Sequence, residues 1–435
     1  MLVVTIELVR GDCLISFYYL LILMARFHSD PRFGVPLFHI GPILATPVKF
    51  AGLFAVLAAL LGAPPHAGAL RRPNGLAPVF LIFATLPVLT SLAFGLPIPN
   101  DPISSFISFG FLFVCTRLLI TTEDRLVRSV RVIVLATTLG SLWLYKQHFL
   151  SHVSRPDGIE GDCNYEALTL VMDLPLAVWM AAHEQRSIWR RIGIASTVVI
   201  GIAIVLTQSR AGLIALAAAG LTTVLYSRRK RFAFAMVSAA VLLLVTLAPS
   251  SLFARFHNIA LSGAAQNGDE VSTRTHFELV KAGLNMIESH PIFGIGLDQF
   301  KTVAPQYNSN LFQVAGRSYI AHNTYVQIGA ECGLPALVCF LLLLIQAMRN
   351  CRMTRRLSIP GISDLALAMQ VSLIGFCIAG VSVTAEYVTA LWILIVLSQN
   401  LREIALAKIG PELIAPVTFR KSPDLVASRR INRAA

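Results

Sequence analysis

The stretch that decides the fold is RSYIAHNTYVQIGAECGLPALVCFLLLLI, residues 317–345. Its polar first part holds His322 and runs without a break into the apolar block Leu334 to Ile345. The run 324–348 predicts a membrane-spanning helix, because roughly 20 apolar residues at about 1.5 Å each cross about 30 Å of hydrocarbon. We therefore expect His322 at the mouth of a span, where water, lipid headgroups and protein meet.

The composition predicts a polytopic membrane protein. Of 435 residues, 55% are hydrophobic and only 14% are charged, and the mean hydropathy is +0.69. A water-soluble globule with such a surface would aggregate. The net charge of +13 falls in short clusters between apolar runs, which argues against nucleic acid as a partner. The seven cysteines show no metal-ligand spacing, so we expect neither a disulfide framework nor a metal site.

Twelve apolar runs predict an all-α fold with about twelve transmembrane helices. The runs are 13–27, 42–62, 76–95, 102–120, 127–146, 164–182, 190–207, 211–227, 231–249, 324–348, 363–383 and 387–405. No small-residue cleavage site follows the first run, so we expect a retained anchor. The chain then divides into helices one to nine (1–249), a polar loop with an amphipathic helix (250–323), helices ten to twelve (324–405) and a basic tail (406–435).

The distribution of basic residues predicts the orientation, because Lys and Arg are retained on the cytoplasmic side. Alternate connections carry Arg71 and Arg72; Arg125, Arg128 and Arg131; Arg186, Arg190 and Arg191; Arg228 to Arg231; and Arg349 to Arg356, as does the tail. The opposite connections, including 147–163, 208–210 and 250–323, are poor in Lys and Arg for their length. We therefore expect both termini inside and the long loop outside.

Two outer connections between spans hold polar groups. The seventh run ends in Ser209 and Arg210, and the chain re-enters the membrane at once. Arg210 either extends to a lipid phosphate or belongs to a binding site, where Ser209 would add a hydrogen-bond donor. The connection 147–163 is either a surface loop whose Asn164 caps the next helix or a further part of that site.

The long outer loop contains a predicted amphipathic helix. Thr275 and Glu278 form a capping-box pattern, which places Arg274 at the positive end of the helix. A guanidinium beside that helix terminus would attract phosphate, although a carboxylate such as Asp269 or Glu270 is an alternative partner. The apolar face is predicted to contain Phe277, Val280, Leu284 and Ile287.

His322 is the candidate proton acceptor, because an unperturbed imidazole has a pKa of about 6.5. The alternative is a structural neighbour of the helix cap. Asp298 is either a ligand for sugar hydroxyls or a turn residue, and Glu331 is interpreted as a buried polar anchor. Two ionisable residues fall within apolar runs, Asp173 without an assigned role and Lys49 as a residue extending to the membrane surface.

Three segments, in their order and on one side of the membrane, resemble the O-antigen ligase/polymerase superfamily of bacterial envelope glycosyltransferases. They are Ser209-Arg210, Arg274 with the helix ending in HPIFGIG (290–296), and HNTYVQ (322–327) with Glu331 and Gly333. The resemblance covers about 200–334 by motif and the rest only by hydropathy. The sequence departs from the family in the loop 147–163, where Gly161-Asp162-Cys163-Asn164 replaces a commoner Pro-Asn form.

The resemblance implies a fold like that of GT-C-type membrane glycosyltransferases, in the bacterial inner membrane with the active site facing the periplasm. It implies cofactor-free and metal-independent transfer of a glycan from undecaprenyl diphosphate to a hydroxyl of the lipid A core or another glycan. Arg210 and Arg274 would hold the diphosphate, and His322 would orient or deprotonate the acceptor hydroxyl. The expected substrate contacts are Ser209, Asn323, Gln327, Asp298 and Arg317.

Within this superfamily we favour a ligase over a polymerase of O-antigen or exopolysaccharide. A different class, a transporter or flippase of lipid-linked glycans, would use Asp173 and Lys49 as a relay. Transporters often contain paired broken helices in two repeats, and the sequence shows no such repeat.

Overall fold

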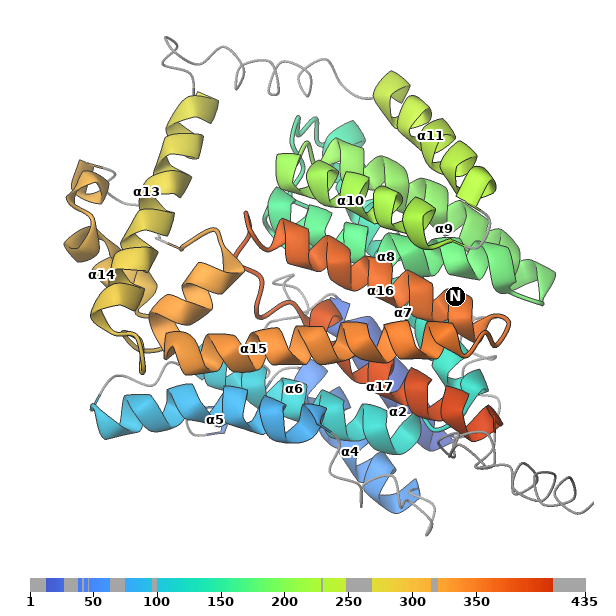
Figure 1. Cartoon of the computed structure of the whole chain (residues 1–435), viewed down its shortest axis with the longest axis horizontal. Coiled ribbons are helices and arrows are strands. Elements are labelled where there is room, and N and C mark those ends of the chain that lie inside the picture. Colours follow the sequence, from blue (N-terminus) through green and yellow to red (C-terminus); the bar gives the residue numbers. More distant parts are fainter. Residues whose placement is uncertain are drawn as a thin grey trace, which may run out of the picture.

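The computed structural model describes residues 13–26, 38–40, 43–45, 47–62, 75–95, 100–227, 230–247, 268–313 and 320–409. Most of the helices lie side by side along the long axis of the molecule, and α13 and α14 lie across one end of this bundle (Figure 1). The bundle contains α2 (Cys13–Arg26), α4 (Pro47–Gly62), α5 (Leu76–Ala93), α6 (Asn100–Leu119), α7 (Glu123–Tyr145), α8 (Cys163–His183), α9 (Ser187–Leu206), α10 (Arg210–Tyr226), α11 (Lys230–Leu247), α15 (Thr324–Arg356), α16 (Ile362–Ala379) and α17 (Thr389–Ile409). The layer across its end contains α13 (Gly268–Ser289), α14 (Phe300–Tyr307) and a 3-10 turn at Ser309–Gln313.

The protein is a polytopic membrane protein. Within the described residues, seven helices are long and apolar enough to cross a membrane, namely α6, α7 with the turn that follows it, α8, α9, α15, α16 and α17. The apolar helices α5 and α10 are shorter. Each predicted apolar run overlaps one helix of the bundle, because a run that must satisfy its backbone groups in hydrocarbon does so as a helix.

The start of the second predicted run is wrong. Residues 43–45 form a short strand, β2 (Ile43–Ala45), which pairs antiparallel with β1 (Phe38–Ile40). The helix begins only at Pro47, whose fixed φ favours the first helical position. Lys49 therefore lies in the first turn of α4, and its side chain is outside the described part of the structure.

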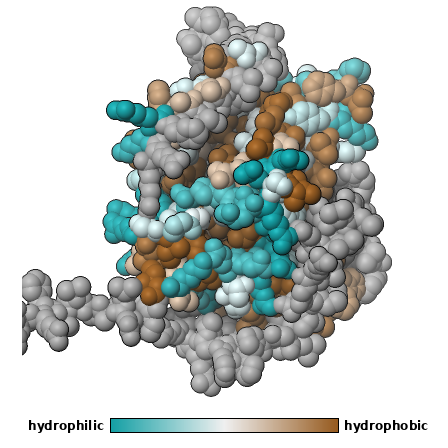
Figure 2. All heavy atoms as spheres, turned by 90° about the vertical axis from the view of Figure 1, so that its right-hand side faces the viewer, coloured by the Kyte–Doolittle hydropathy of each residue, from teal (hydrophilic) through white to brown (hydrophobic). Residues whose placement is uncertain are grey.

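The bundle has two chemically different ends. Helix α15 runs from the end covered by α13 to the opposite end, where its C-terminal arginines lie (Figure 1). This opposite end carries a broad hydrophilic band (Figure 2). Ion pairs link the helices there: Arg131 of α7 pairs with Glu184 after α8 at 2.6 Å, and Arg117 of α6 pairs with Glu403 of α17 at 2.8 Å. Among the described residues, basic side chains predicted to be cytoplasmic, such as Arg131 and Arg355, thus lie at the end away from α13.

The layer formed by α13 and α14 has its own small core. Leu279, Ala282 and Met286 of α13 are buried against Phe300 of α14 and Ala330 of α15. Of the predicted apolar face, Ile287 packs against this core, whereas Phe277 and Leu284 are 70% and 53% exposed. The helical period of the sequence is correct, and the layer packs mainly through a neighbouring face of α13.

Candidate active site

His322 lies just before α15 and is held in an unusual backbone conformation. Its φ is +48°, in the left-handed region that non-glycine residues rarely adopt. On one side, Ala321 N–H donates to Oε1 of buried Gln327 at 2.8 Å. On the other, Asn323 Oδ1 accepts from the N–H groups of Tyr325 and Val326, both at 3.0 Å, and caps the helix. Such strained positions are often found at functional sites, where the surrounding contacts hold them in place.

The imidazole of His322 stacks on a second imidazole, that of His276 in α13. The ring centroids are 4.0 Å apart and the planes differ by 9°. Burial and, to a smaller extent, His276 lower the pKa of His322 to about 4, against an opposite contribution from the carboxylate of Asp162. Both rings are consequently neutral near pH 7. The sequence analysis did not single out His276, since nothing in its spacing indicates this tertiary contact.

Arg210 is the first residue of α10 and lies near this histidine pair. The pKa of His276 is lowered first by burial and then by the cation of Arg210, with a further contribution from Arg155. Arg210 follows a tight turn in which Ser209 Oγ accepts from Gly212 N–H at 3.2 Å and caps the helix. The structure thus brings Arg210 and His322, far apart in the sequence, to the same end of the bundle through His276.

Arg155 is a second cation of this region that sequence reasoning missed. It lies in the connection 147–163, whose role the sequence left open. Its Nη2 donates to Asn164 Oδ1 at 3.2 Å and its Nε donates to Thr207 carbonyl oxygen at 3.4 Å. Gln208 Nε2 also donates to Ser154 carbonyl oxygen at 2.7 Å. These bonds attach the loop to the turn that carries Arg210.

Asn164 does not cap α8, contrary to one of the two interpretations of this loop. The cap is Asp162, whose side chain accepts from the N–H groups of Asn164 and Tyr165 at 2.7 and 3.1 Å. Asn164 lies inside the helix and accepts from Ser209 Oγ at 2.8 Å. Asp162 is favoured at this position because a carboxylate also interacts with the positive end of the helix.

The predicted start of the outer helix is wrong. Helix α13 begins at Gly268, so Arg274 lies in its second turn and not at its positive end. Thr275 is likewise inside the helix, and Glu278 Oε2 accepts from Asn308 Nδ2 at 2.7 Å instead of closing a capping box. The side chain of Arg274 and the whole of Arg317 lie outside the described residues.

Three expected substrate contacts are engaged within the protein. Ser209 is fully buried between Asn164 and Gly212. Gln327 holds the backbone beside His322, and Asn323 caps α15 while donating to Val381 carbonyl oxygen at 3.0 Å. These bonds hold the backbone around Arg210 and His322 in place, and substrate contact by the three side chains stays a prediction. Asp298 forms an ion pair with Lys301 in a turn with φ +58°, which agrees with the alternative interpretation of a turn residue.

The HPIFGIG segment docks on a break in α15. Gly333 has φ +82° and ψ 169° and interrupts the helix. The freed Leu334 N–H donates to Pro291 carbonyl oxygen at 2.8 Å, and Gly296 N–H donates to Glu331 carbonyl oxygen at 3.0 Å. A Cβ on Gly294 would lie 2.4 Å from Glu331 backbone atoms, so only glycine permits this approach.

Glu331 fastens the same junction from inside, as predicted for a buried polar anchor. Its side chain is buried, and Oε1 accepts from Phe300 N–H at 3.0 Å. The junction joins α14 and the end of α13 to α15. It therefore determines how His276 of α13 meets His322 at the start of α15.

The described residues contain no group of three His, Cys, Asp or Glu side chains that could hold a metal ion. The cysteines whose side chains are described are free thiols.

Residues 195–341 match the family model described as O-Antigen ligase. This segment carries a domain of the O-antigen ligase/polymerase superfamily, in agreement with the resemblance drawn from the sequence. The matched segment contains Arg210, His276, His322 and the docked HPIFGIG segment, so the junction described above lies within the superfamily domain. No curated protein matches the chain.

The match over this domain supports an enzyme of glycan ligation or polymerisation in a bacterial inner membrane. It also associates the protein with lipid-linked glycans and polysaccharide biosynthesis.

Proposed function

We propose that this protein transfers a glycan from undecaprenyl diphosphate to an acceptor hydroxyl at the periplasmic face, in the manner of an O-antigen ligase. The observation that carries the proposal is the stacked pair of neutral histidines beside the cations of Arg210 and Arg155. A polymerase of the same superfamily would use the same groups and differ in its acceptor.

The membrane arrangement proposed with this function has twelve spans and a GT-C-type fold. Both termini and the basic connections are cytoplasmic, and α13, α14 and the histidine pair are periplasmic. The arginine-bearing C-terminal end of α15 lies opposite α13, which supports this orientation (Figure 1).

In the proposed reaction, the acceptor oxygen attacks the anomeric carbon of the donor sugar. The bond from that carbon to the diphosphate oxygen breaks, and undecaprenyl diphosphate leaves with the bonding electrons. Negative charge increases on the leaving oxygen in the transition state, so guanidinium groups there lower the barrier. Arg210 and Arg274 are the proposed diphosphate ligands, and Arg155 adds positive charge on the same side.

His322 is the proposed acceptor of the hydroxyl proton. A protonated imidazole could not accept it, and the lowered pKa keeps the ring neutral across the physiological range. His276 fixes the orientation of this ring by stacking. Guanidinium groups provide the charge stabilisation that a divalent metal provides in other transferases, which supports a metal-independent mechanism.

Purified protein in lipid nanodiscs tests the proposal when it is given an undecaprenyl-diphosphate-linked glycan and candidate acceptors. We expect glycan transfer with release of undecaprenyl diphosphate, and loss of transfer by about 10²–10⁴-fold in His322→Ala. Arg274→Ala should also abolish transfer while the protein remains folded. The matched control is His183→Ala, a histidine at the C-terminal end of α8 that pairs with Asp364 and lies outside the site and the junction.

Full activity of both His322→Ala and Arg274→Ala would contradict the site assignment. Movement of the donor across a vesicle membrane without formation of a glycosidic bond would contradict the enzyme and favour a transporter.

A further inference from the structure

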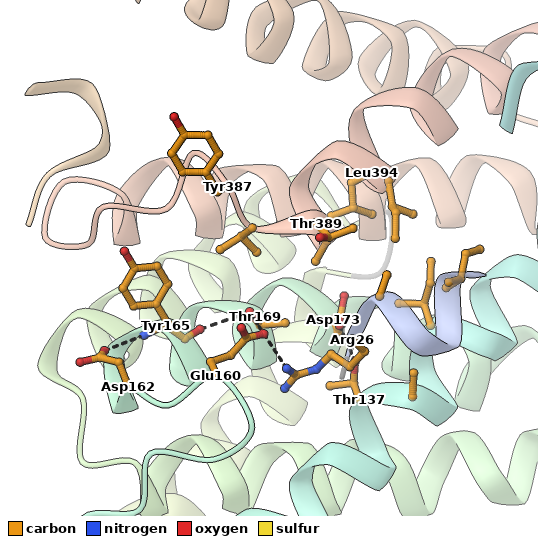
Figure 3. A pocket seen from close by; sticks show the side chains of 17 residues that line it. Arg26, Thr137, Glu160, Asp162, Tyr165, Thr169, Asp173, Tyr387, Thr389 and Leu394 are labelled. Carbon is orange, nitrogen blue, oxygen red and sulfur yellow. Dashed lines mark hydrogen bonds and ion pairs between the residues drawn. The ribbon is translucent and has the colours of Figure 1, made fainter. Parts of the chain in front are cut away.

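A cavity of about 260 Å³ lies inside the bundle, between α2, α7, α8 and α17. Figure 3 shows that charged and hydroxyl side chains project into it from several of these elements. The other part of its lining is apolar and includes Ile22, Ile133, Val388, Ile393 and Leu394. Asp162 lies at its edge and also influences both stacked histidines, so the cavity adjoins the candidate active site.

The charges of the cavity are unbalanced. Its lining residues include one guanidinium, Arg26, and three carboxyl groups, those of Glu160, Asp162 and Asp173. Nη1 of Arg26 donates to Glu160 Oε1 at 2.6 Å (Figure 3). Its Nη2 donates to Oε1 of Glu166, which lies outside the lining, at 2.7 Å. Glu160 and Glu166 therefore share the cation of Arg26. Asp173 adds a carboxyl group that takes no part in these ion pairs.

Asp173 has an unused hydrogen-bonding atom in this cavity. The residue is 2% exposed, and its Oδ2 accepts from Thr137 Oγ1 at 2.5 Å. Its Oδ1 has no hydrogen-bond partner, and neither does Nε of Arg26. A buried ionisable side chain in a membrane-spanning helix is costly and usually serves a function. An acceptor and a donor without partners beside one cavity indicate a ligand that supplies both kinds of group.

A sugar ring matches this set of groups. Its hydroxyls donate to a carboxyl oxygen and accept from a guanidinium N–H, while its C–H faces pack on aliphatic side chains. The volume is slightly below the roughly 300–1,000 Å³ of typical small-molecule sites, which limits the occupant to about one ring. The excess of carboxyl groups would repel a diphosphate or a uronic acid. We propose that the cavity binds one neutral sugar ring of a glycan substrate.

This inference rests on the proposed function, but its test does not require transfer. Saturation-transfer NMR on the nanodisc-embedded protein would use methyl glucoside and methyl galactoside as neutral probes and methyl glucuronide as the charged comparator. We expect saturation of the neutral glycosides and not of the glucuronide. Asp173→Leu should weaken binding about tenfold or more, the effect of losing one hydrogen bond to a charged group.

Two further variants separate a lost binding site from a misfolded protein. Ala390→Phe fills the cavity and leaves its polar groups unchanged, so it should also abolish saturation. Asp364→Asn removes an exposed carboxylate that pairs with His183 at the start of α16, and it should bind like the wild type. All variants are compared at equal thermal stability.

The transfer assay identifies which substrate supplies the ring. A raised KM for the acceptor alone in Asp173→Leu assigns the acceptor sugar, and a raised KM for the donor alone assigns the donor sugar. Binding that persists in both Asp173→Leu and Ala390→Phe would overturn the inference, as would a wild type that transfers glycan but saturates no neutral glycoside. A protein that binds neutral glycosides without transferring any glycan would contradict the proposed function and keep the sugar cavity.

Discussion

The histidine–arginine site and the neighbouring cavity differ in the sign of their charge: the site is positive and the cavity is negative. The first combines two neutral imidazoles with the cations of Arg210 and Arg155. The second has carboxyl groups in excess of its single guanidinium. Asp162 borders the cavity and acts electrostatically on both imidazoles, so the two regions meet at the N-terminus of α8.

From this difference we infer that the two regions bind different parts of the substrates. A lipid-linked donor carries a diphosphate that needs cations, and glycans carry neutral hydroxyls that need acceptors and donors in balance. In the proposed arrangement the carboxyl groups of the cavity repel the diphosphate, which binds instead beside the neighbouring cations. Variants that alter one region should therefore leave binding in the other intact.

The largest expected effect is on the cationic side. Arg210→Ala should reduce transfer by about 10²–10³-fold, as expected for removal of one preorganised group that stabilises transition-state charge. Arg210→Lys should recover only part of the activity, because an ammonium group lacks the planar fork that binds two phosphate oxygens. Steady-state transfer rates with saturating donor measure both variants.

The same preparation of Arg210→Ala should bind neutral glycosides in the cavity as the wild type does. Arg190→Ala, an exposed arginine at the far end of the bundle, is the matched control and should keep full activity. Equal losses of transfer and of glycoside binding in Arg210→Ala would show that the two regions form a single site.

The sequence was sufficient to predict the helices of the bundle and to select two residues of the candidate site. Apolar runs near 20 residues predict helices because hydrocarbon leaves the backbone no other partner, and this holds at α8 and α15. Arg210 and His322 were found because each stands at the mouth of an apolar run. Their proximity could not be read from the sequence, since it depends on α13 lying between them.

The residues that were missed or misassigned depend on tertiary contacts. His276 acquires its role by stacking, and Arg155 by bonds to another loop. The apolar face expected for α13 packs against the protein only in part, because Ala282 and Met286 lie in the core while Phe277 is exposed. Ser209 and Gln327 carry polar groups suited to a substrate, yet both bond within the protein.

An intermediate effect is expected at the junction that holds α13 against α15. A Cβ on Gly333 would lie 2.1 Å from Ile292 carbonyl oxygen, and its φ of +82° disfavours any L side chain. Gly333→Ala should therefore cost more than the approximately 1–2 kcal/mol of a left-handed residue alone. Hydrogen exchange should show lost protection at 290–296 and 324–333 and unchanged protection in the bundle, with transfer reduced because His276 leaves His322.

Gly361→Ala is the matched control for this variant. Gly361 also has a positive φ, +75°, but no atom lies within 4 Å of its added Cβ. This substitution should carry the backbone cost without the collision and leave transfer unchanged. Similar loss of transfer in the two variants would show that the junction does not determine the site.

The smallest expected effect is a shift of the pH profile, which separates imidazole from carboxyl chemistry. Since the folded-state pKa of His322 is about 4, kcat/KM should stay level from pH 8 to about 5 and fall below that as His322 takes up a proton. Between the unfolded value of about 6.5 and the folded value, only the unfolded chain binds this proton, so stability should decrease as the pH falls through that window.

His276→Phe keeps an aromatic ring against His322 and removes the second imidazole. The acid limb of the pH profile should therefore move upward by less than one pH unit, because burial remains the larger cause of the lowered pKa. An acid limb near 6.5 in the wild type, or a downward shift in His276→Phe, would show that His322 does not act as a buried neutral base.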